Sequence, residues 1–393
     1  MSDPVVLERA RSPSETYALI EPHFMRLGIS RVARQTGLDR IGLPCFAAIR
    51  PNSRSLATHY GKGLSDAAAR TAAAMEAVEF AIAEEPNVPM CVSTLDDLVK
   101  RGADVFDCKR LLPLGEPLDR ELELVWVTGR RLATGAPVFV PADAVTLGDA
   151  IPRLTDMAKT TNGLASGNNV DEAIQHGLCE LIERDALTLW SLQDEAAARS
   201  RCFAVGDLES EIARNLHEQL VAAGLQLTLF DLTTDIGVPV VHALVEERSA
   251  RRQLFDVSAG TSCHPDSSRA AIGAITEAVQ SRLTNIAGSR DDYSSSEYTQ
   301  SLPLDLGALL DGAMPAGRPP RNLSAIRSVE GAGTSIVAAL AARGIDDVVA
   351  VELGGTEMGV AVVRLLSGQL EDCLGNVNWW PGRRALAALG PRN

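Results

Sequence analysis

The 393-residue chain is poor in lysine and carries an excess of negative charge. Among 37 basic residues it has only four lysines, and its formal net charge is −14. The four are Lys62, Lys100, Lys109 and Lys159. Nucleic acids and anionic membranes are bound through clustered Lys and Arg side chains. We therefore expect no nucleic acid and no membrane surface among the partners of this chain.

The seven cysteines are scattered and odd in number, and no two have the C-x-x-C spacing. This pattern is unlike that of a disulfide framework or of a structural zinc site. The sequence also lacks an apolar signal core near its start and any apolar run of the length that spans a membrane. We expect a cytoplasmic protein whose thiols stay reduced.

The signatures of two large classes of ATP-using enzymes are missing. The sequence has no G-x-x-x-x-G-K-[ST] loop, which marks P-loop proteins, and no HRD and DFG motifs of protein kinases. A single Gly61-Lys62-Gly63 turn is too short to predict a phosphate site by itself.

The predicted helices and strands alternate irregularly, which indicates a mixed α/β fold. At about 150 residues per domain, the length allows two or three units or one large fold. Helices are expected over residues 14–27, 65–85 and 266–287, with a further long helix from Asn169. Strands are expected over residues 44–49, 55–60, 122–127, 137–141, 225–232, 238–245, 255–261, 348–353 and 360–366. Residues 303–322 are rich in Gly and Pro and are expected to form a surface connection.

One polar pattern repeats on three of the predicted helices. Each helix follows a glycine-containing turn and carries two polar residues at positions i and i+3, which lie on one helix face. The pairs are Glu76 and Glu79, Glu180 and Glu183, and Glu277 and Gln280. Their neighbours in the sequence are mostly apolar, and buried carboxylates need a cation or hydrogen bonds to compensate their charge.

Converging carboxylates are suited to Mg²⁺, which binds few protein oxygens and leaves room for phosphate oxygens. The arginines Arg184 and Arg282 lie close to these pairs in the sequence and could contact phosphates. Two other readings exist for such a pair. A single Glu-x-x-Glu pair usually lies on a solvated face, and two carboxylates can also serve glycoside hydrolysis. The threefold repetition argues against the first, and glycoside hydrolysis explains neither Gln280 nor the arginines.

These segments together resemble the YcaO family of ATP-dependent enzymes that modify peptide backbones. The strongest match is the run Leu-Cys-Glu-Leu-Ile-Glu-Arg-Asp-Ala at 178–186. Other matching segments are 36–44, 61–63, 75–79, 162–168, 277–284 and 290–292. The match covers about residues 10–295, and we extend one YcaO-like domain over 1–393. Residues 296–393 form its C-terminal part.

The resemblance implies that the three helices converge on one ATP with Mg²⁺ between sheet layers. Carried over by position, the expected Mg²⁺ ligands are Glu76, Glu79, Glu180, Glu183 and Glu277. The expected nucleotide contacts are Arg11, Thr16, Lys62, Asn168, Glu172, Arg184, Gln280 and Arg282. Glu183 and Arg184 are expected to act in catalysis, with the arginine stabilising charge that develops during phosphoryl transfer.

The sequence departs from the family pattern in two places. The first helix motif often reads S-x-x-E-x-x-E-R, whereas this chain has Ala73 and Phe80 at the serine and arginine positions. The C-terminus lacks the proline-rich tail of many azoline-forming members. The segments 39–44 and 50–55 look like the subgroup that works with a TfuA-type partner, for which the expected product is a thioamide.

Three functions follow from the resemblance. The leading one is phosphorylation of a peptide backbone amide at oxygen by ATP, giving a thioamide on a peptide or protein substrate with a TfuA-like partner. An azoline-forming cyclodehydratase is the alternative within the family. A nucleotide-binding accessory subunit without chemistry is the third. Homodimerisation is the default expectation for quaternary structure.

No general base can be identified from the sequence. His59 and His176 are candidates, but each is more often structural. Trp379 and Trp380 fit either a partner-docking surface or a segment packed on the body of the protein, because aromatic side chains are common anchors in interfaces.

Overall fold

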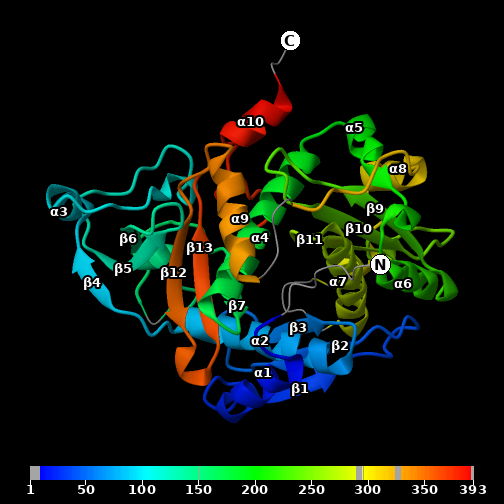
Figure 1. Ribbon diagram of the computed structural model, residues 1–393, viewed down its shortest axis with the longest axis horizontal. Helices are drawn as coiled ribbons and strands as arrows, with labels where there is room; N and C mark the ends of the chain where they lie inside the picture. Colours follow the sequence, from blue (N-terminus) through cyan, green and yellow to red (C-terminus); the bar gives the residue numbers. More distant parts are fainter. Residues whose placement is uncertain (1–8, 150, 289–293, 295, 324–328, 391–393) are drawn as a thin grey trace.

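The computed structural model describes residues 9–149, 151–288, 294, 296–323 and 329–390. Within these residues the chain forms three sheets whose strand pairs are all antiparallel, with helices packed on and between them (Figure 1). The mixed α/β fold expected from the sequence is confirmed.

The first sheet has three strands in the order β1-β2-β3 and carries helix α2. Its elements are β1 (Arg31–Arg34), β2 (Cys45–Ile49), β3 (Thr58–Lys62) and α2 (Asp66–Glu84). The Ser65 hydroxyl accepts a hydrogen bond from the Ala68 N–H, so Ser65 caps α2 at the start of the range 65–85 expected from the sequence. Helix α1 (Pro13–Ile20) packs against α2.

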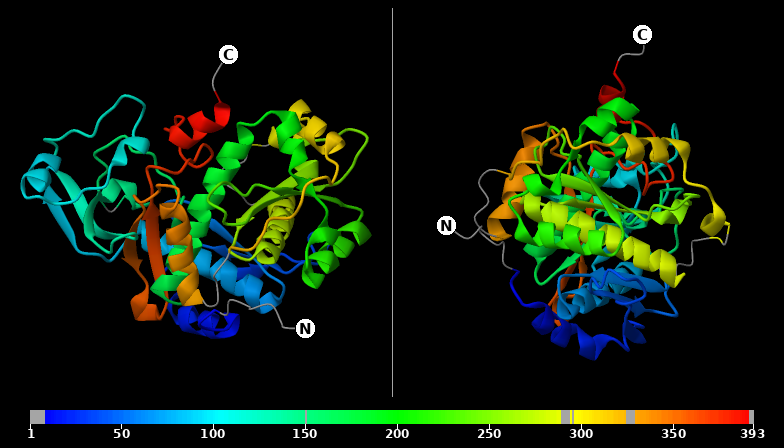
Figure 2. Two further views of the ribbon diagram at one scale, coloured as in Figure 1. Left: turned by 45° about the horizontal axis from the view of Figure 1, so that its top comes forward. Right: turned by 90° about the vertical axis from the view of Figure 1, so that its right-hand side faces the viewer.

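The second sheet has six strands in the order β4-β5-β12-β13-β7, with β6 paired to β5 beside this path. Its strands are β4 (Met90–Ser93), β5 (Leu124–Arg131), β6 (Pro137–Pro141), β7 (Leu164–Gly167), β12 (Val349–Gly354) and β13 (Ala361–Leu366). The last two strands therefore lie at the centre of a sheet that begins more than 200 residues earlier. Strands β4, β5 and β6 extend to one side of the molecule, together with helix α3 (Leu95–Lys100) (Figures 1 and 2).

The third sheet has the order β11-β10-β9-β8 and packs against helix α7 (Ser267–Ala287). Its strands are β8 (Cys202–Phe203), β9 (Gln226–Asp231), β10 (Val240–Glu246) and β11 (Val257–Cys263). Helix α6 (Glu211–Ala222) contacts both α7 and β9.

Helix α4 (Val170–Ser191) connects the second and third sheets. It follows β7 directly, and the Asn169 side chain caps it by accepting the Glu172 N–H. It packs on β7 and β13 of the second sheet and also contacts β11 of the third. In the same way α2 contacts β7, and α7 contacts β3. The three strand–helix units β3–α2, β7–α4 and β11–α7 therefore form a closed ring of contacts.

A glycine in each of these strands allows the following helix to approach closely. A Cβ atom added to Gly61, Gly167 or Gly260 would overlap backbone atoms of α2, α4 and α7 respectively. The glycines noted in the sequence before each acidic helix thus have a packing role at these three positions.

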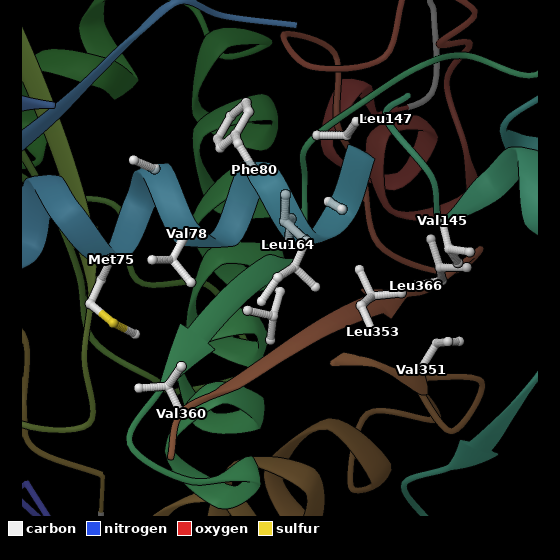
Figure 3. Packing of buried hydrophobic residues seen from close by; sticks show 14 of the residues in the cluster. Met75, Val78, Phe80, Val145, Leu147, Leu164, Val351, Leu353, Val360 and Leu366 are labelled. Atoms are coloured by element: carbon white, nitrogen blue, oxygen red, sulfur yellow. The ribbon is translucent and has the colours of Figure 1, made fainter. Parts of the chain in front are cut away.

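The apolar core beside α2 fixes that helix on the second sheet (Figure 3). Met75, Val78 and Phe80 belong to one buried cluster with Leu164 of β7 and Val360. Each fully buried side chain of this size contributes about 1.5–3 kcal/mol.

Two sequence predictions were wrong in extent. The helix expected over 14–27 ends at Ile20, because Pro22 has no N–H to continue the helical bonding, and a 3-10 turn (Glu21–His23) follows. The expected surface connection over 303–322 contains α8 (Leu304–Gly312), whose Leu309 and Leu310 are buried. The match at 290–292 lies outside the described residues.

Five further helices were not predicted: α5 (Glu195–Ser200), α9 (Val329–Ala341), α10 (Arg383–Leu389), and the α3 and α6 described above. None of the helices in the described part of the chain has the length and apolar character of a membrane span.

Candidate functional site

The carboxylates of α2 are held by two different strands. The Tyr60 N–H of β3 donates to Glu76 Oε2 at 3.0 Å. Glu79 is 8% exposed and accepts hydrogen bonds from Ser166 of β7. Burial, together with the charges of Glu180 and Glu76, raises the pKa of Glu79 well above its ordinary value.

The carboxylates of α4 are held in the same manner. The Gly163 N–H, just before β7, donates to Glu180 Oε2 at 3.2 Å, and the Cys263 N–H of β11 donates to Glu183 Oε2 at 3.3 Å. Desolvation raises the pKa of Glu180, and desolvation with the charge of Glu277 raises that of Glu183. Carboxylates that repel one another in this way are suited to share a cation.

The third helix closes the ring of contacts. Glu277 of α7 forms an ion pair with Lys62 of β3, with Nζ 2.7 Å from Oε2, and both side chains are partly exposed. Desolvation acts to lower the pKa of Lys62, but the charges of Glu277, Glu183 and Glu76 raise it. The structure thus brings together all five predicted metal ligands and Lys62.

Arg184 lies beside Glu180 on α4, 3.7 Å from its Oε1, and its side chain is 35% exposed. Although desolvation acts to lower it, the charges of Glu180, Glu183, Asp372 and Glu277 raise the pKa of Arg184. The predicted catalytic pair, Glu183 and Arg184, therefore lies within the carboxylate cluster.

Two charged residues at this cluster were missed in the sequence. Arg364 of β13 is 1% exposed, and desolvation lowers its pKa to about 10 despite the charges of Glu180, Asp372 and Glu79. Asp372 is 8% exposed. The signal was an arginine in the otherwise apolar strand 361–366, because isolated charges are rarely buried without a partner.

The predicted contacts near the N-terminus form one hydrogen-bonded network. Arg11 Nη1 donates to the carbonyl oxygens of Asn168, at 3.1 Å, and Gly359, at 2.6 Å. The Thr16 hydroxyl donates to Asn168 Oδ1 at 2.5 Å. Glu172 Oε2 accepts the Asn168 backbone N–H and Nδ2 at 3.0 and 2.8 Å. These four residues therefore join α1 to the start of α4.

The remaining predicted contacts are placed differently. Gln280 is half-buried one turn beyond Glu277. Its backbone carbonyl oxygen accepts a hydrogen bond from the Thr284 hydroxyl at 2.9 Å. Arg282 forms an ion pair with Glu247, whose other oxygen lies 2.8 Å from Arg40 Nη2. The structure thus engages Arg282 in an ion pair outside the carboxylate cluster.

The two histidine candidates occupy different environments. His59 is fully buried against Phe80, with ring centroids 4.7 Å apart, and desolvation lowers its pKa to about 4. His176 lies on α4 one turn before Glu180 and is exposed, yet desolvation by surrounding protein and the charge of Arg9 lower its pKa to about 4. Only His176 has the charges of Lys62 and Glu277 among its neighbours.

The tryptophan pair packs on the body of the protein. Trp379 Nε1 donates to Glu371 Oε2 at 3.0 Å, and the Arg110 guanidinium lies 4.3 Å from the Trp380 ring centroid. These contacts favour packing on the body of the protein over a surface for docking a partner.

The carboxylates fit Mg²⁺ that is shared with phosphate oxygens. In the described ranges, no group of three or more His, Cys, Asp or Glu side chains could hold a metal ion. Side chains of the described residues alone therefore do not complete a metal site here. Mg²⁺ commonly binds through only one or two carboxylates, and phosphates and water supply its other ligands. All five side chains offer the hard oxygen donors that this ion prefers.

The chain belongs to the YcaO family. Residues 60–371 match the family model described as YcaO cyclodehydratase, ATP- and Mg²⁺-binding. Over 377 residues the chain is 35% identical to a protein of Rhizobium leguminosarum bv. trifolii named for its position in the tfuA 3′ region, covering 93% of this chain and 89% of that one. A protein of Methanothermobacter thermautotrophicus is 36% identical over 295 residues, covering 74% of each chain.

Two solved structures have a similar fold. The YcaO protein of Methanopyrus kandleri bound with AMPPCP and Mg²⁺ superimposes with a TM-score of 0.72 at 25% identity, covering 94% of each chain. A heterocyclase in complex with substrate and cofactor gives a TM-score of 0.75 over 95% of this chain and 54% of that one, at 18% identity. The expectation of ATP and Mg²⁺ as cofactors is confirmed through the family.

Proposed function

We propose that this protein uses ATP and Mg²⁺ to activate a peptide backbone amide by phosphorylating its oxygen, and that the product is a thioamide. The observation that carries the proposal is the convergence of carboxylates from α2, α4 and α7, each held by a backbone N–H, a hydroxyl or Lys62. A site of this composition binds a polyphosphate through metal ions and a few cations.

The residues of this chain position the reactants. Glu76, Glu79, Glu180, Glu183 and Glu277 would hold Mg²⁺, which neutralises the charge of the triphosphate when bound. Lys62 and Arg184 supply cationic groups at the carboxylates, since Lys62 is paired with Glu277 and Arg184 lies 3.7 Å from Glu180. The network of Arg11, Thr16, Asn168 and Glu172 would fix the nucleotide at the start of α4. Gln280 stays a predicted nucleotide contact, whereas Arg282 is paired with Glu247 outside the carboxylate cluster.

The chemistry requires activation because resonance makes an amide carbonyl a poor electrophile. A nucleophile adds to the carbonyl carbon, and the resulting oxyanion attacks the γ-phosphate of ATP with release of ADP. Phosphate then leaves with the former carbonyl oxygen. If sulfide is the nucleophile, the carbon retains sulfur and a thioamide forms.

A TfuA-like partner is the proposed source of sulfide. Support comes from the 35% identity to the protein named for the tfuA 3′ region. The alternative is an azoline, formed when a Cys, Ser or Thr side chain of the substrate is the nucleophile. That alternative is favoured by the cyclodehydratase description of the family.

The test is intact-mass analysis of a candidate peptide after incubation with ATP, Mg²⁺, sulfide and the partner. Exchange of oxygen for sulfur with ATP consumption supports thioamide formation, and loss of water supports the azoline. An unchanged peptide with bound, unhydrolysed ATP would indicate an accessory subunit. The Glu180→Gln variant is the control that separates enzymatic from spontaneous modification.

A further inference from the structure

The negative charges of four carboxylates raise the pKa of Arg184, and three of these carboxylates are proposed metal ligands. These three are Glu180, Glu183 and Glu277, and the fourth is Asp372. Metal ions bound to the first three carboxylates would neutralise their negative charge and place positive charge near the Arg184 guanidinium. Asp372 would then be the carboxylate left to hold Arg184 in place.

Asp372 has an oxygen that is available for this contact. Its Oδ1 accepts the Gly375 N–H at 2.8 Å, whereas its Oδ2 is buried and has no hydrogen-bond partner among the described residues. A buried acceptor without a partner is costly, and a partner that arrives with a ligand or a side-chain movement would remove that cost.

The backbone on both sides of Asp372 is fixed to α4. The Glu371 N–H donates to Asp185 Oδ1 at 3.1 Å, and the Cys373 N–H donates to Thr188 Oγ1 at 3.0 Å. Arg384 at the start of α10 makes a two-pronged contact with Asp185, at 2.8 and 2.9 Å. Asp185 is fully buried and directly follows Arg184. This connection lies where α10 meets α4 (Figure 1).

We infer that Asp372 is a positioning residue for Arg184. We also infer that residues 371–385 form a clamp on α4, which holds the Arg184 side chain in place at the nucleotide site. The inference rests on the proposed function, since it assumes that Arg184 contacts a bound nucleotide. Arg364 on β13 is a second buried cation near Asp372, since the charge of Asp372 acts on its pKa.

The test measures the affinity for AMPPCP with Mg²⁺ by calorimetry, which requires no knowledge of the peptide substrate. We expect Asp372→Asn to weaken binding about tenfold, as for loss of a hydrogen bond to a charged group. Asp372→Glu, which keeps the charge, should recover most of the loss. The matched control is Asp347→Asn, because Asp347 also accepts loop N–H and hydroxyl donors, at 2.6 and 2.7 Å, but takes no part in the site.

Non-additivity separates a positioning role from a general structural one. If Asp372 acts through Arg184, Arg184→Lys combined with Asp372→Asn binds no more weakly than Arg184→Lys alone. Additive losses, or an Asp372→Asn affinity equal to that of Asp347→Asn, would overturn the inference while leaving the proposed function intact. A wild-type protein that binds no AMPPCP would instead contradict the proposed function, and the inference with it.

A second variant covers the case in which Asp372→Asn does not fold. Thr188→Val keeps the shape of the side chain but removes the oxygen that accepts the Cys373 N–H. We expect AMPPCP affinity to fall about threefold, again without addition to Arg184→Lys. An unchanged affinity, or a loss that adds to that of Arg184→Lys, would count against the clamp.

Discussion

At the residue scale, the site consists of carboxylates that lie close enough to repel one another. Glu79 and Glu183 lie among other carboxylates, and burial and like charge raise the pKa of both. The spacing of the acidic pairs was readable in the sequence, because residues three apart share a helix face. Arg364 stands out as an arginine in an apolar strand, but its place beside α4 and that of Asp372 were not readable, because local sequence does not show which distant elements meet.

A prediction about pH follows for Glu79. A carboxyl whose pKa is raised on folding favours the folded state below its unfolded pKa, and this contribution is lost as the pH rises through the raised value. In the absence of metal we expect Glu79→Gln, which cannot ionise, to melt above wild type at about pH 8, with the difference shrinking towards about pH 5. Thermal melts in EDTA measure this difference. A difference independent of pH would show that Glu79 is not repelled.

Arg282 is predicted to serve stability rather than nucleotide binding. It pairs with Glu247, which also binds Arg40. Arg282→Met should lower the free energy of unfolding by about 1–2 kcal/mol, since the pair is only partly buried. AMPPCP affinity should stay within about twofold of wild type. A large loss of affinity in a stable variant would restore the phosphate contact inferred from the sequence.

At the element scale, three strand–helix units arrange the acidic pairs. Each helix packs on its own strand and contacts the strand of the next unit, so that carboxylates meet at the centre of the ring. Strand and helix positions were predicted well where apolar runs and caps are strong, as at Ser65 and Asn169. Helices such as α8 were missed because their apolar residues lie between Gly and Pro residues that suggested a loop.

The glycines of these units are predicted to be intolerant of a side chain. In Gly61→Ala the new methyl group would overlap the backbone of α2 at Ala69 and Ala73. We expect a loss of about 3 kcal/mol in urea unfolding, the scale of overpacking in a dense core. The control is Gly206→Ala, because nothing lies within 4 Å of that added atom. Equal stabilities of the two variants would contradict close packing of β3 on α2.

At the scale of the whole molecule, sheets that are far apart in the sequence meet at one site. The centre of the second sheet is supplied by β12 and β13, and the C-terminal segment returns to α4 through Asp185 and Arg384. The second sheet therefore combines strands from both halves of the sequence. The closure of the second sheet by late strands depends on long-range pairing, which local sequence patterns do not specify.

The measurement that tests the central claim most directly is calorimetric binding of AMPPCP to wild type, Glu180→Gln and Glu183→Gln, with Mg²⁺ and with EDTA. A matched control on the same helix is Asp171→Asn, since Asp171 is exposed in the first turn of α4. We predict that wild type and Asp171→Asn bind only with Mg²⁺, and that both glutamate variants lose affinity about 100-fold while remaining folded. Equal binding by all four proteins, or binding of wild type that persists in EDTA, would contradict a magnesium–nucleotide site at the convergence of the three helices.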